Sequence, residues 1–364
     1  MLRLKLTHRI LGQYLAKPIY NKEGKLLLAE ETMLTEPILK NLREQNIYFG
    51  YVNIFPELLY KDELFPDNQK ILLLNSIYNL HEIIKRIIPV IADDAKRPEL
   101  YKLSDSINSE LYKIVSGLID IAFYLDDSSL VNFIEYRFMF PFHINKIIMN
   151  LIYSAYIAKA LKLNKTDIEK LLGAVIAADA GFYKLPDKFL NPNYYVSESD
   201  YNEILKHPYY SFDILRNIIG FDSVTASLTY MSHERIDGSG YPRKLKNDEI
   251  NFLAQIIGIA NTFTELKYSP RYKNMLSPEL IYNLISGQCF GKNLSDIFIA
   301  SVPPYPIGTT VFLNDSELGV VTGFDKNFPF NPTVRKIDAG NLYDSIVEYD
   351  LKLDKTKKIT GYAW

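Results

Sequence analysis

The spacing of apolar positions changes several times along this 364-residue chain, and each change marks a boundary. Short apolar runs separated by turn residues occupy residues 1–60. The three-to-four spacing that is typical of helices then dominates until residue 302. Beyond it, the runs are rich in β-branched and aromatic residues. The pattern predicts a mainly α protein with a small α/β module over 1–60, a helical linker over 61–125, a helical domain over 126–302 and a small β unit over 303–364.

The N-terminal module is predicted from turn signals and one helix signal. Gly24 lies between two strand-like runs, 15–20 and 25–29, which predicts a hairpin. Residues 35–37 read Thr-Glu-Pro and supply an N-cap residue followed by an early proline. We therefore expect a short helix here, followed by a strand over 48–52.

Helix signals recur through the middle of the chain. One helix is expected to begin at His143, and the next to run from Lys165 into Asp179. Residues 206–208, Lys-His-Pro, begin a third, and residues 277–278, Ser-Pro, look like an N-cap with proline at the first helical position. The domain is therefore expected to be built mostly from packed helices.

The linker contains one histidine, and the tail contains the strand signals. His81 lies in a helical stretch without a partner motif, so we expect a surface or interdomain position rather than a ligand role. Residues 309–313, 318–323 and 346–349 are β-branched or aromatic runs separated by Asn, Asp and Gly. These runs predict a small antiparallel sheet.

Composition and charge narrow the range of functions. With 41 basic and 43 acidic residues, the formal net charge of -2 gives no general attraction to long nucleic acids or anionic membranes. A small anionic nucleotide would have to be held by a local site. The single cysteine, Cys289, excludes an intramolecular disulfide. Because no apolar run resembles a signal peptide or a membrane span, we expect a cytoplasmic protein without membrane insertion.

Two short motifs carry the candidate chemistry. Residues 177–181 read Ala-Ala-Asp-Ala-Gly, and residues 233–242 read His-Glu-Arg-Ile-Asp-Gly-Ser-Gly-Tyr-Pro. Gly240 allows the backbone to come close to a ligand, and Tyr241 with Pro242 forms a rigid aromatic turn. Such a turn can stack on a nucleotide base or can simply hold helices together.

Together these motifs resemble the signature blocks of the HD-GYP family of metal-dependent phosphodiesterases. In that family, histidines and aspartates on several helices gather two or three iron- or manganese-type ions. A bridging hydroxide then attacks the phosphorus of cyclic di-GMP. The resemblance spans roughly half of the chain and is most specific over residues 237–242. It implies that the helical domain over 126–302 is an HD-GYP domain.

The resemblance places four of the family's metal ligands in this chain: His143, Asp179, His207 and His233. Among these, Asp179, His207 and His233 form a set of two histidines and one carboxylate. Such a set is enough for one divalent ion, iron or manganese, with water completing its shell. For each histidine taken alone, an ordinary structural role in the core or on the surface is the alternative.

The other ligand positions differ from the family pattern. An ion that relied on these positions would keep only His143 and the shared Asp179, so a binuclear centre is not expected. The lysine that follows the His-Asp pair in active members is also replaced. The replacements are Met139 for a glutamate, Ala178 and Ser232 for histidines, Asn261 for an aspartate and Phe182 for the lysine.

A basic segment before the last predicted helix completes the resemblance. The family grips the nucleotide's phosphates there, and residues 270–274 of this chain read Pro-Arg-Tyr-Lys-Asn. Arg271 lies next to the expected arginine position, and Lys273 lies where a second arginine is usual. We expect Arg271 and Lys273 to bind ligand together with Gly240, Tyr241 and Pro242. A surface-exposed basic turn is the alternative.

The sequence therefore predicts a degenerate HD-GYP protein of cyclic di-GMP signalling, impaired or inactive as a phosphodiesterase. It would act as a regulatory or nucleotide-sensing module that binds cyclic di-GMP or a related nucleotide and works with protein partners. Two alternatives stay open. One is a working hydrolase with a single metal ion and water, and the other is a protein-protein interaction module that binds no nucleotide.

Overall fold

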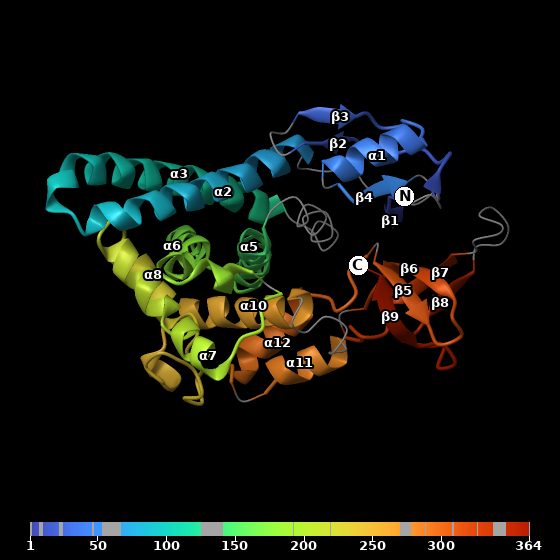
Figure 1. The fold of residues 1–364 in the computed structure, drawn as a ribbon. Helices are drawn as coiled ribbons and strands as arrows, with labels where there is room; N and C mark the ends of the chain where they lie inside the picture. The colour runs from blue at the N-terminus through green and yellow to red at the C-terminus, as the bar shows by residue number, and fades with distance from the viewer. Residues whose placement is uncertain are drawn as a thin grey trace. The chain divides into compact units, whose positions relative to one another are not determined.

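Figure 1 shows the fold in the computed structural model. The structure describes residues 2–6, 10–21, 25–45, 47–52, 67–124, 141–191, 193–218, 220–269, 278–287, 289–307, 309–325, 327–337 and 347–363. They belong to two compact units. The first contains the described parts of Met1–Leu72 and Val302–Trp364, and the second contains those of Leu73–Tyr124 and Phe140–Ser301. Both ends of the chain therefore contribute to the same unit.

The N-terminal part of the first unit has the predicted small α/β character. Strand β1 (Leu2–Lys5) pairs antiparallel with β4 (Phe49–Val52), and β2 (Ile19–Tyr20) pairs antiparallel with β3 (Leu26–Leu28). Helix α1 (Glu36–Glu44) lies between β3 and β4 in the chain and begins after the Thr35 N-cap, with proline in its first turn. The predicted hairpin pairing, short helix and returning strand are confirmed.

The C-terminal part of the first unit is a five-stranded antiparallel sheet in the order β8-β7-β6-β5-β9. The predicted antiparallel sheet is confirmed, and it has two strands, β7 and β9, beyond the three runs recognised in the sequence. The strands are β5 (Thr310–Leu313), β6 (Leu318–Gly323), β7 (Thr333–Ile337), β8 (Glu348–Asp350) and β9 (Ile359–Ala363).

A shared hydrophobic core joins the two parts of the first unit. Leu6, Leu39 and Val52 from the N-terminal part belong to the same buried cluster as Val320 and Ile337 from the sheet. Apolar burial of this kind is the main favourable term in folding. The N-terminal module therefore packs on the C-terminal sheet, although the two are far apart in the sequence.

The second unit is helical. Its central helix α5 packs against both α6 and α10, while α8 packs against α9 and the short 3-10 helix η4. Helix α2 begins before the boundary between the units. The helices are α2 (Asp67–Ile91), α3 (Arg97–Tyr124), α5 (Phe142–Ala160), α6 (Lys165–Ala177), η4 (Ala180–Lys184), η5 (Asp187–Leu190), α7 (Glu198–Ile204), α8 (His207–Arg216), α9 (Ser223–Met231), α10 (Phe252–Tyr268), α11 (Pro278–Ile285) and α12 (Lys292–Ser301). The mainly α fold with small sheets near the two ends confirms the predicted fold class.

Aromatic packing holds α5 and α10 together. Every residue of α5 from Ile147 to Ala158 is buried, as expected for a helix that has neighbours on all sides. Tyr153 of α5 meets Phe263 of α10 edge to face at a centroid distance of 4.9 Å, and Phe298 of α12 lies 5.0 Å from Phe263. Such pairs add to the stability that burial alone provides. The positions of α5 and α10 in the second unit are thereby fixed.

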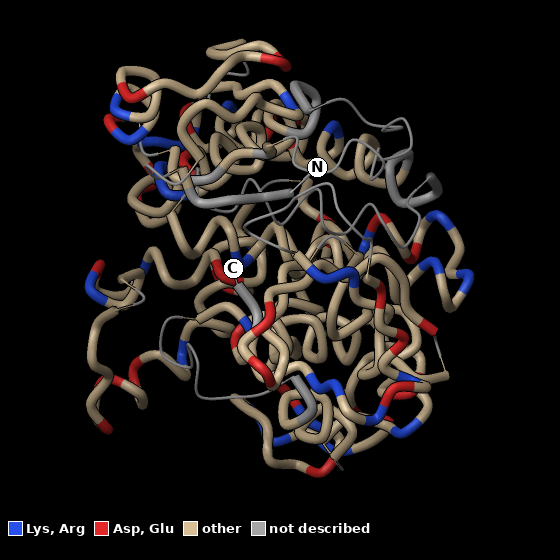
Figure 2. Tube along the Cα trace, turned by 90° about the vertical axis from the view of Figure 1, so that its right-hand side faces the viewer, with Lys and Arg blue, Asp and Glu red and all other residues tan. Residues whose placement is uncertain are grey.

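The distribution of charged residues and the character of the described helices agree with the expectations from the composition. Figure 2 shows basic and acidic residues interspersed along the described trace. None of the helices in the described part of the chain combines the length and the apolar character that a membrane crossing requires. Because basic and acidic residues are mixed along the trace, an anionic ligand must be attracted by a few nearby side chains.

The expectation of a surface or interdomain position for His81 is wrong. This residue lies on α2 in the second unit and is 1% exposed. Its Nε2 atom donates to the Ile176 carbonyl oxygen at 2.7 Å, so its Nδ1 accepts from the Tyr183 hydroxyl at 2.8 Å. Burial lowers its pKa from 6.5 to about 4. The imidazole is therefore a neutral part of the core.

This burial predicts a pH-dependent loss of stability. An unfolded His81 takes up a proton near pH 6.5, whereas the folded one does so only near pH 4, so falling pH favours unfolding across that window. As the pH falls from 7 to 4, His81 should lower the free energy of unfolding by about 3 kcal/mol. Urea unfolding of the wild type and of His81→Gln, repeated across this range, should show a flatter pH dependence for the variant. If the unfolding free energies of the two proteins changed equally with pH, a neutral, buried His81 would be contradicted.

Candidate metal centre

Three of the four predicted metal ligands converge in the second unit. One donor atom each from Asp179, His207 and His233 lies within 4.8 Å of the other two, and all three residues are buried. The two histidine Nε2 atoms are 3.0 Å apart, and the Nε2 of His207 is 3.7 Å from Oδ1 of Asp179. Separations this short allow one metal ion to contact all three side chains.

The end of α6 places Asp179 beside His207. Helix α6 was expected to run into Asp179 but ends at Ala177, and Asp179 is instead the N-cap residue of the 3-10 helix η4. Gly181 of η4 lies so close to α8 that an added Cβ would be 2.0 Å from the carbonyl oxygen of His207. Ser211 links the two segments, because its hydroxyl donates to the carbonyl of Ala178 and accepts from the amide of Gly181. Glycine at position 181 therefore lets the aspartate and the histidine meet.

His207 is held with its Nε2 atom directed at the other candidate ligands, 3.0 Å from Nε2 of His233. Its Nδ1 donates to the Ile204 carbonyl oxygen at 2.7 Å, which leaves the lone pair on Nε2. Phe182, at the position of the family's lysine, stacks on the imidazole with a centroid distance of 4.2 Å. The ring is therefore restrained by both a hydrogen bond and an aromatic contact.

His233 is held by the Gly-Tyr-Pro segment. The Tyr241 ring stacks on the imidazole at a centroid distance of 4.6 Å, and its hydroxyl is 2.8 Å from Nδ1. The Asn261 side-chain nitrogen lies 3.3 Å from Nε2 of His233. A hydrogen-bond partner on the second ring nitrogen is the usual way to orient a metal-binding histidine. Tyr241 supplies that partner here.

Backbone contacts around Glu234 shape this segment. Its buried carboxylate accepts from the amide groups of Arg243 at 2.7 Å and of Leu245 at 2.9 Å. An added Cβ at Gly240 would be 2.4 Å from the amide nitrogen of Arg235. The space that Gly240 leaves is thus used by the protein's own backbone. A ligand contact at Gly240 or at Pro242 stays a prediction.

The protonation states suit a divalent metal ion. Burial lowers the pKa of His207 to about 4 and that of His233 well below 6.5, so both rings are neutral at physiological pH. Burial alone would raise the pKa of Asp179, but the ammonium of Lys146 outweighs it through its charge and its hydrogen bond and holds that pKa below its ordinary value. One carboxylate and two neutral imidazoles form a donor set suited to a divalent transition-metal ion.

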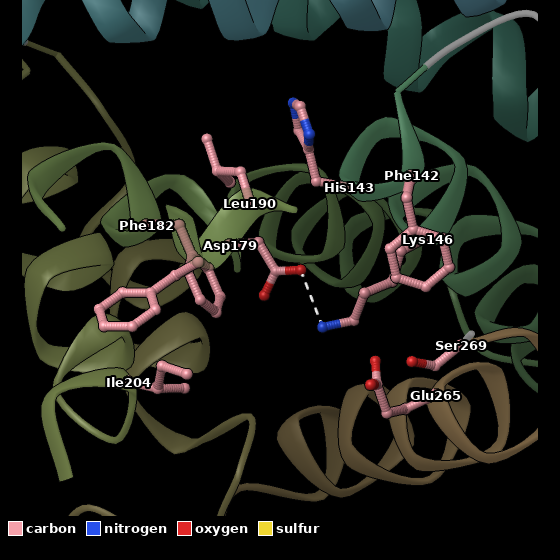
Figure 3. Close-up of a pocket in the computed structure, with 10 residues that line it drawn as sticks. Phe142, His143, Lys146, Asp179, Phe182, Leu190, Ile204, Glu265 and Ser269 are labelled. Atoms are coloured by element: carbon pink, nitrogen blue, oxygen red, sulfur yellow. Dashed lines mark ion pairs between the residues drawn. The ribbon is translucent and has the colours of Figure 1, made fainter. Parts of the chain in front are cut away.

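His143 does not join this group. It lies near the start of α5, is half-buried and meets the Tyr183 ring edge to face at 6.2 Å. It lines a cavity of about 60 Å³ together with Asp179 and other residues, drawn in Figure 3. Its role as a metal ligand stays a prediction.

The replaced ligand positions offer little to a second ion. The buried Ala178 has no donor atom, and the Ser232 hydroxyl donates to the backbone carbonyl of Thr229 at 2.9 Å. The Asn261 side chain is held by Asn150, whose side-chain nitrogen donates to Oδ1 at 3.2 Å. Three other positions lie outside the described residues, namely Met139, Arg271 and Lys273.

One residue of the site was missed in the sequence. The Lys146 ammonium lies 3.0 Å from Oδ2 of Asp179, and its side chain is only 12% exposed. It follows His143 by three positions, a spacing that places both residues on one face of α5. That helical spacing from a candidate ligand was the signal available in the sequence.

Comparisons with known proteins agree with this geometry. Residues 135–280 match the family model of the HD domain. Over 83% of its length, the chain is 24% identical to the cyclic di-GMP phosphodiesterase PdeB of Borreliella burgdorferi and covers 87% of that protein. It is also 29% identical to the 3'3'-cGAMP-specific phosphodiesterase 1 of Vibrio cholerae, over 43% of this chain and 36% of that protein.

A solved structure shares the fold. The chain resembles Bd1817, a HDG"Y"P protein from Bdellovibrio bacteriovorus, with a TM-score of 0.51 and 15% sequence identity. The match covers 82% of this chain and 97% of that one. The domain match and the relatives identify the chain as a member of the HD-GYP family, and the solved structure shares its fold.

Proposed function

We propose that this HD-GYP protein acts in cyclic-dinucleotide signalling as a regulatory or nucleotide-sensing module whose phosphodiesterase activity is low or absent. Its proposed ligand is cyclic di-GMP or a related nucleotide, its proposed location is the cytoplasm, and protein partners would read its state. The observation that carries the proposal is the donor set itself. Asp179, His207 and His233 converge as a group fit for one ion, whereas Ala178 and Ser232 supply no ligand for another.

The chemistry of phosphodiester cleavage explains why a site with one metal ion should hydrolyse its ligand slowly. Two closely spaced ions together activate a water molecule and stabilise the charge that develops on phosphate. Asp179, His207 and His233 would hold a single iron or manganese ion, which would supply Lewis-acid chemistry without a second ion to stabilise the developing negative charge. We therefore assign binding rather than efficient turnover to this site.

The protein's own side chains would hold the ion and the ligand. His207 and His233 present Nε2, and Tyr241 fixes the orientation of His233 through its hydroxyl. Arg271 and Lys273 are the proposed phosphate contacts, from the basic segment recognised in the sequence. Two alternatives remain: a hydrolase that works with one ion, and an interaction module that binds no nucleotide. Turnover assays test the first, and nucleotide titration tests the second.

Metal content is the first prediction. Protein purified without chelator should carry about one divalent ion per chain, and His207→Ala should lower metal affinity by about tenfold or more, because a ligand is removed outright. Elemental analysis after dialysis against limiting manganese or iron measures both. Arg216→Ala, at the exposed end of the same helix α8, is the matched control and should keep the metal. Equal metal in the wild type and His207→Ala would remove His207 from the site.

Turnover is the second prediction. Cyclic di-GMP hydrolysis should be absent or very slow with added manganese or iron, because the positions for a second ion are replaced. Chromatography of the products measures it, and rapid conversion to the linear dinucleotide or GMP would contradict the proposal. The combined variant Ala178→His, Ser232→His and Asn261→Asp should bind more metal than the wild type. Its rate of cyclic di-GMP hydrolysis should still stay low, because Phe182 occupies the position at which active family members carry a lysine.

Nucleotide binding is the third prediction. Tyr241→Ala should weaken cyclic di-GMP binding about tenfold or more, because one aromatic stack is worth about 1–3 kcal/mol per base. Tyr241→Phe keeps the ring but loses the hydroxyl bond to His233, so it separates stacking from support of the metal ligand. Calorimetry at moderate salt, with metal content determined for each protein, gives both effects. A wild type that shows no heat and no thermal stabilisation would favour the interaction module instead.

A further inference from the structure

The two carboxylate oxygens of Asp179 face different partners. Oδ1 lies 3.7 Å from Nε2 of His207, on the side of the histidine pair. Oδ2 lies 3.0 Å from the ammonium of Lys146. A carboxylate that bridges two metal ions uses one oxygen for each, so the lysine lies on the oxygen that a second ion would need.

Lys146 is built into the site rather than resting on its surface. Its side chain is 12% exposed, and that of Asp179 is 9% exposed. Figure 3 shows the side chain extending from α5 into the cavity, where the ammonium points between Asp179 and Glu265 of α10. An ion pair this buried interacts far more strongly than an exposed one. Removing one partner leaves an uncompensated buried charge.

The charges of the described residues around this cavity disfavour a second divalent ion. Asp179 and Glu265 are the two acidic residues among those lining the cavity, and the Lys146 ammonium already offsets part of their charge. One divalent ion at the Asp179, His207 and His233 group would already make the sum of these charges positive. Another ion would add two positive charges close to the ammonium, and the described lining residues supply no carboxylate besides Asp179 and Glu265 to balance them.

We propose that the Lys146 ammonium is a built-in cation that takes the place of a second metal ion on Asp179 and so restricts the site to one ion. This inference rests on the proposed function only in assuming that Asp179 can bind metal. Lys146 would then limit the site to one ion in addition to the ligands replaced at positions 178, 232 and 261. Lys146 is thus a specificity-determining residue for metal number.

Manganese titration of matched variants tests this proposal. Lys146→Met keeps most of the length of the side chain and removes its charge, whereas Lys146→Arg keeps the charge. Lys159→Met, at the exposed end of the same helix, is the control for removing a lysine from α5. Calorimetry and elemental analysis of the full chain give affinity and stoichiometry for each protein.

The expected result is a gain of metal binding in Lys146→Met alone. Its manganese affinity should rise by about tenfold or more, or its stoichiometry should exceed that of the wild type, because a cation next to the ligand carboxylate is gone. Lys146→Arg and Lys159→Met should match the wild type. Unchanged or weaker binding by Lys146→Met would overturn the proposal.

Thermal melts keep the test decisive if Lys146→Met folds poorly. Without metal, this variant should melt below the wild type, and saturating manganese should raise its Tm by more than it raises that of the wild type. An equal shift in both proteins would again overturn the role of Lys146. A wild type that binds no manganese would refute the metal-binding part of the proposed function, while a gain in Lys146→Met would still support the lysine's role.

Discussion

The buried carboxylate of Asp179 is the constraint on which the rest of the site depends. A carboxylate removed from water must be compensated by positive charge or by hydrogen bonds, or it takes up a proton. Here Lys146 meets one oxygen, and the histidine pair lies beside the other. The surrounding fold serves this arrangement. Helix α6 ends early to release Asp179, and Gly181 allows α8 to bring His207 against it.

Much of this architecture could be predicted from the sequence, because it depends on local signals. Proline and cap residues marked the starts of α1, α8 and α11, and β-branched runs marked three strands of the C-terminal sheet. The candidate ligands Asp179, His207 and His233 were identified from their motifs, and the structure brings them together. Their donor atoms are close enough to share one ion, while their role as metal ligands stays a prediction.

Other features depend on tertiary contacts that a single sequence does not reveal. The apolar spacing of α6 continues through Ala178, so nothing local marked the switch to η4 that releases Asp179. The burial of His81 requires a neighbouring helix to offer the Ile176 carbonyl, which is a contact across 95 positions. Likewise, Lys146 acquires its role only once η4 brings Asp179 beside α5.

The Gly-Tyr-Pro segment supports one of the candidate metal ligands directly. Tyr241 stacks on His233 and bonds to its Nδ1, and Gly240 makes room for the backbone at Arg235. Both contacts are needed to orient a single histidine, whether one ion or two are bound. The segment therefore has a structural role at His233 that does not depend on the number of ions. Its presence alone does not argue for a binuclear centre, and the number of ions must be inferred from the charges around Asp179.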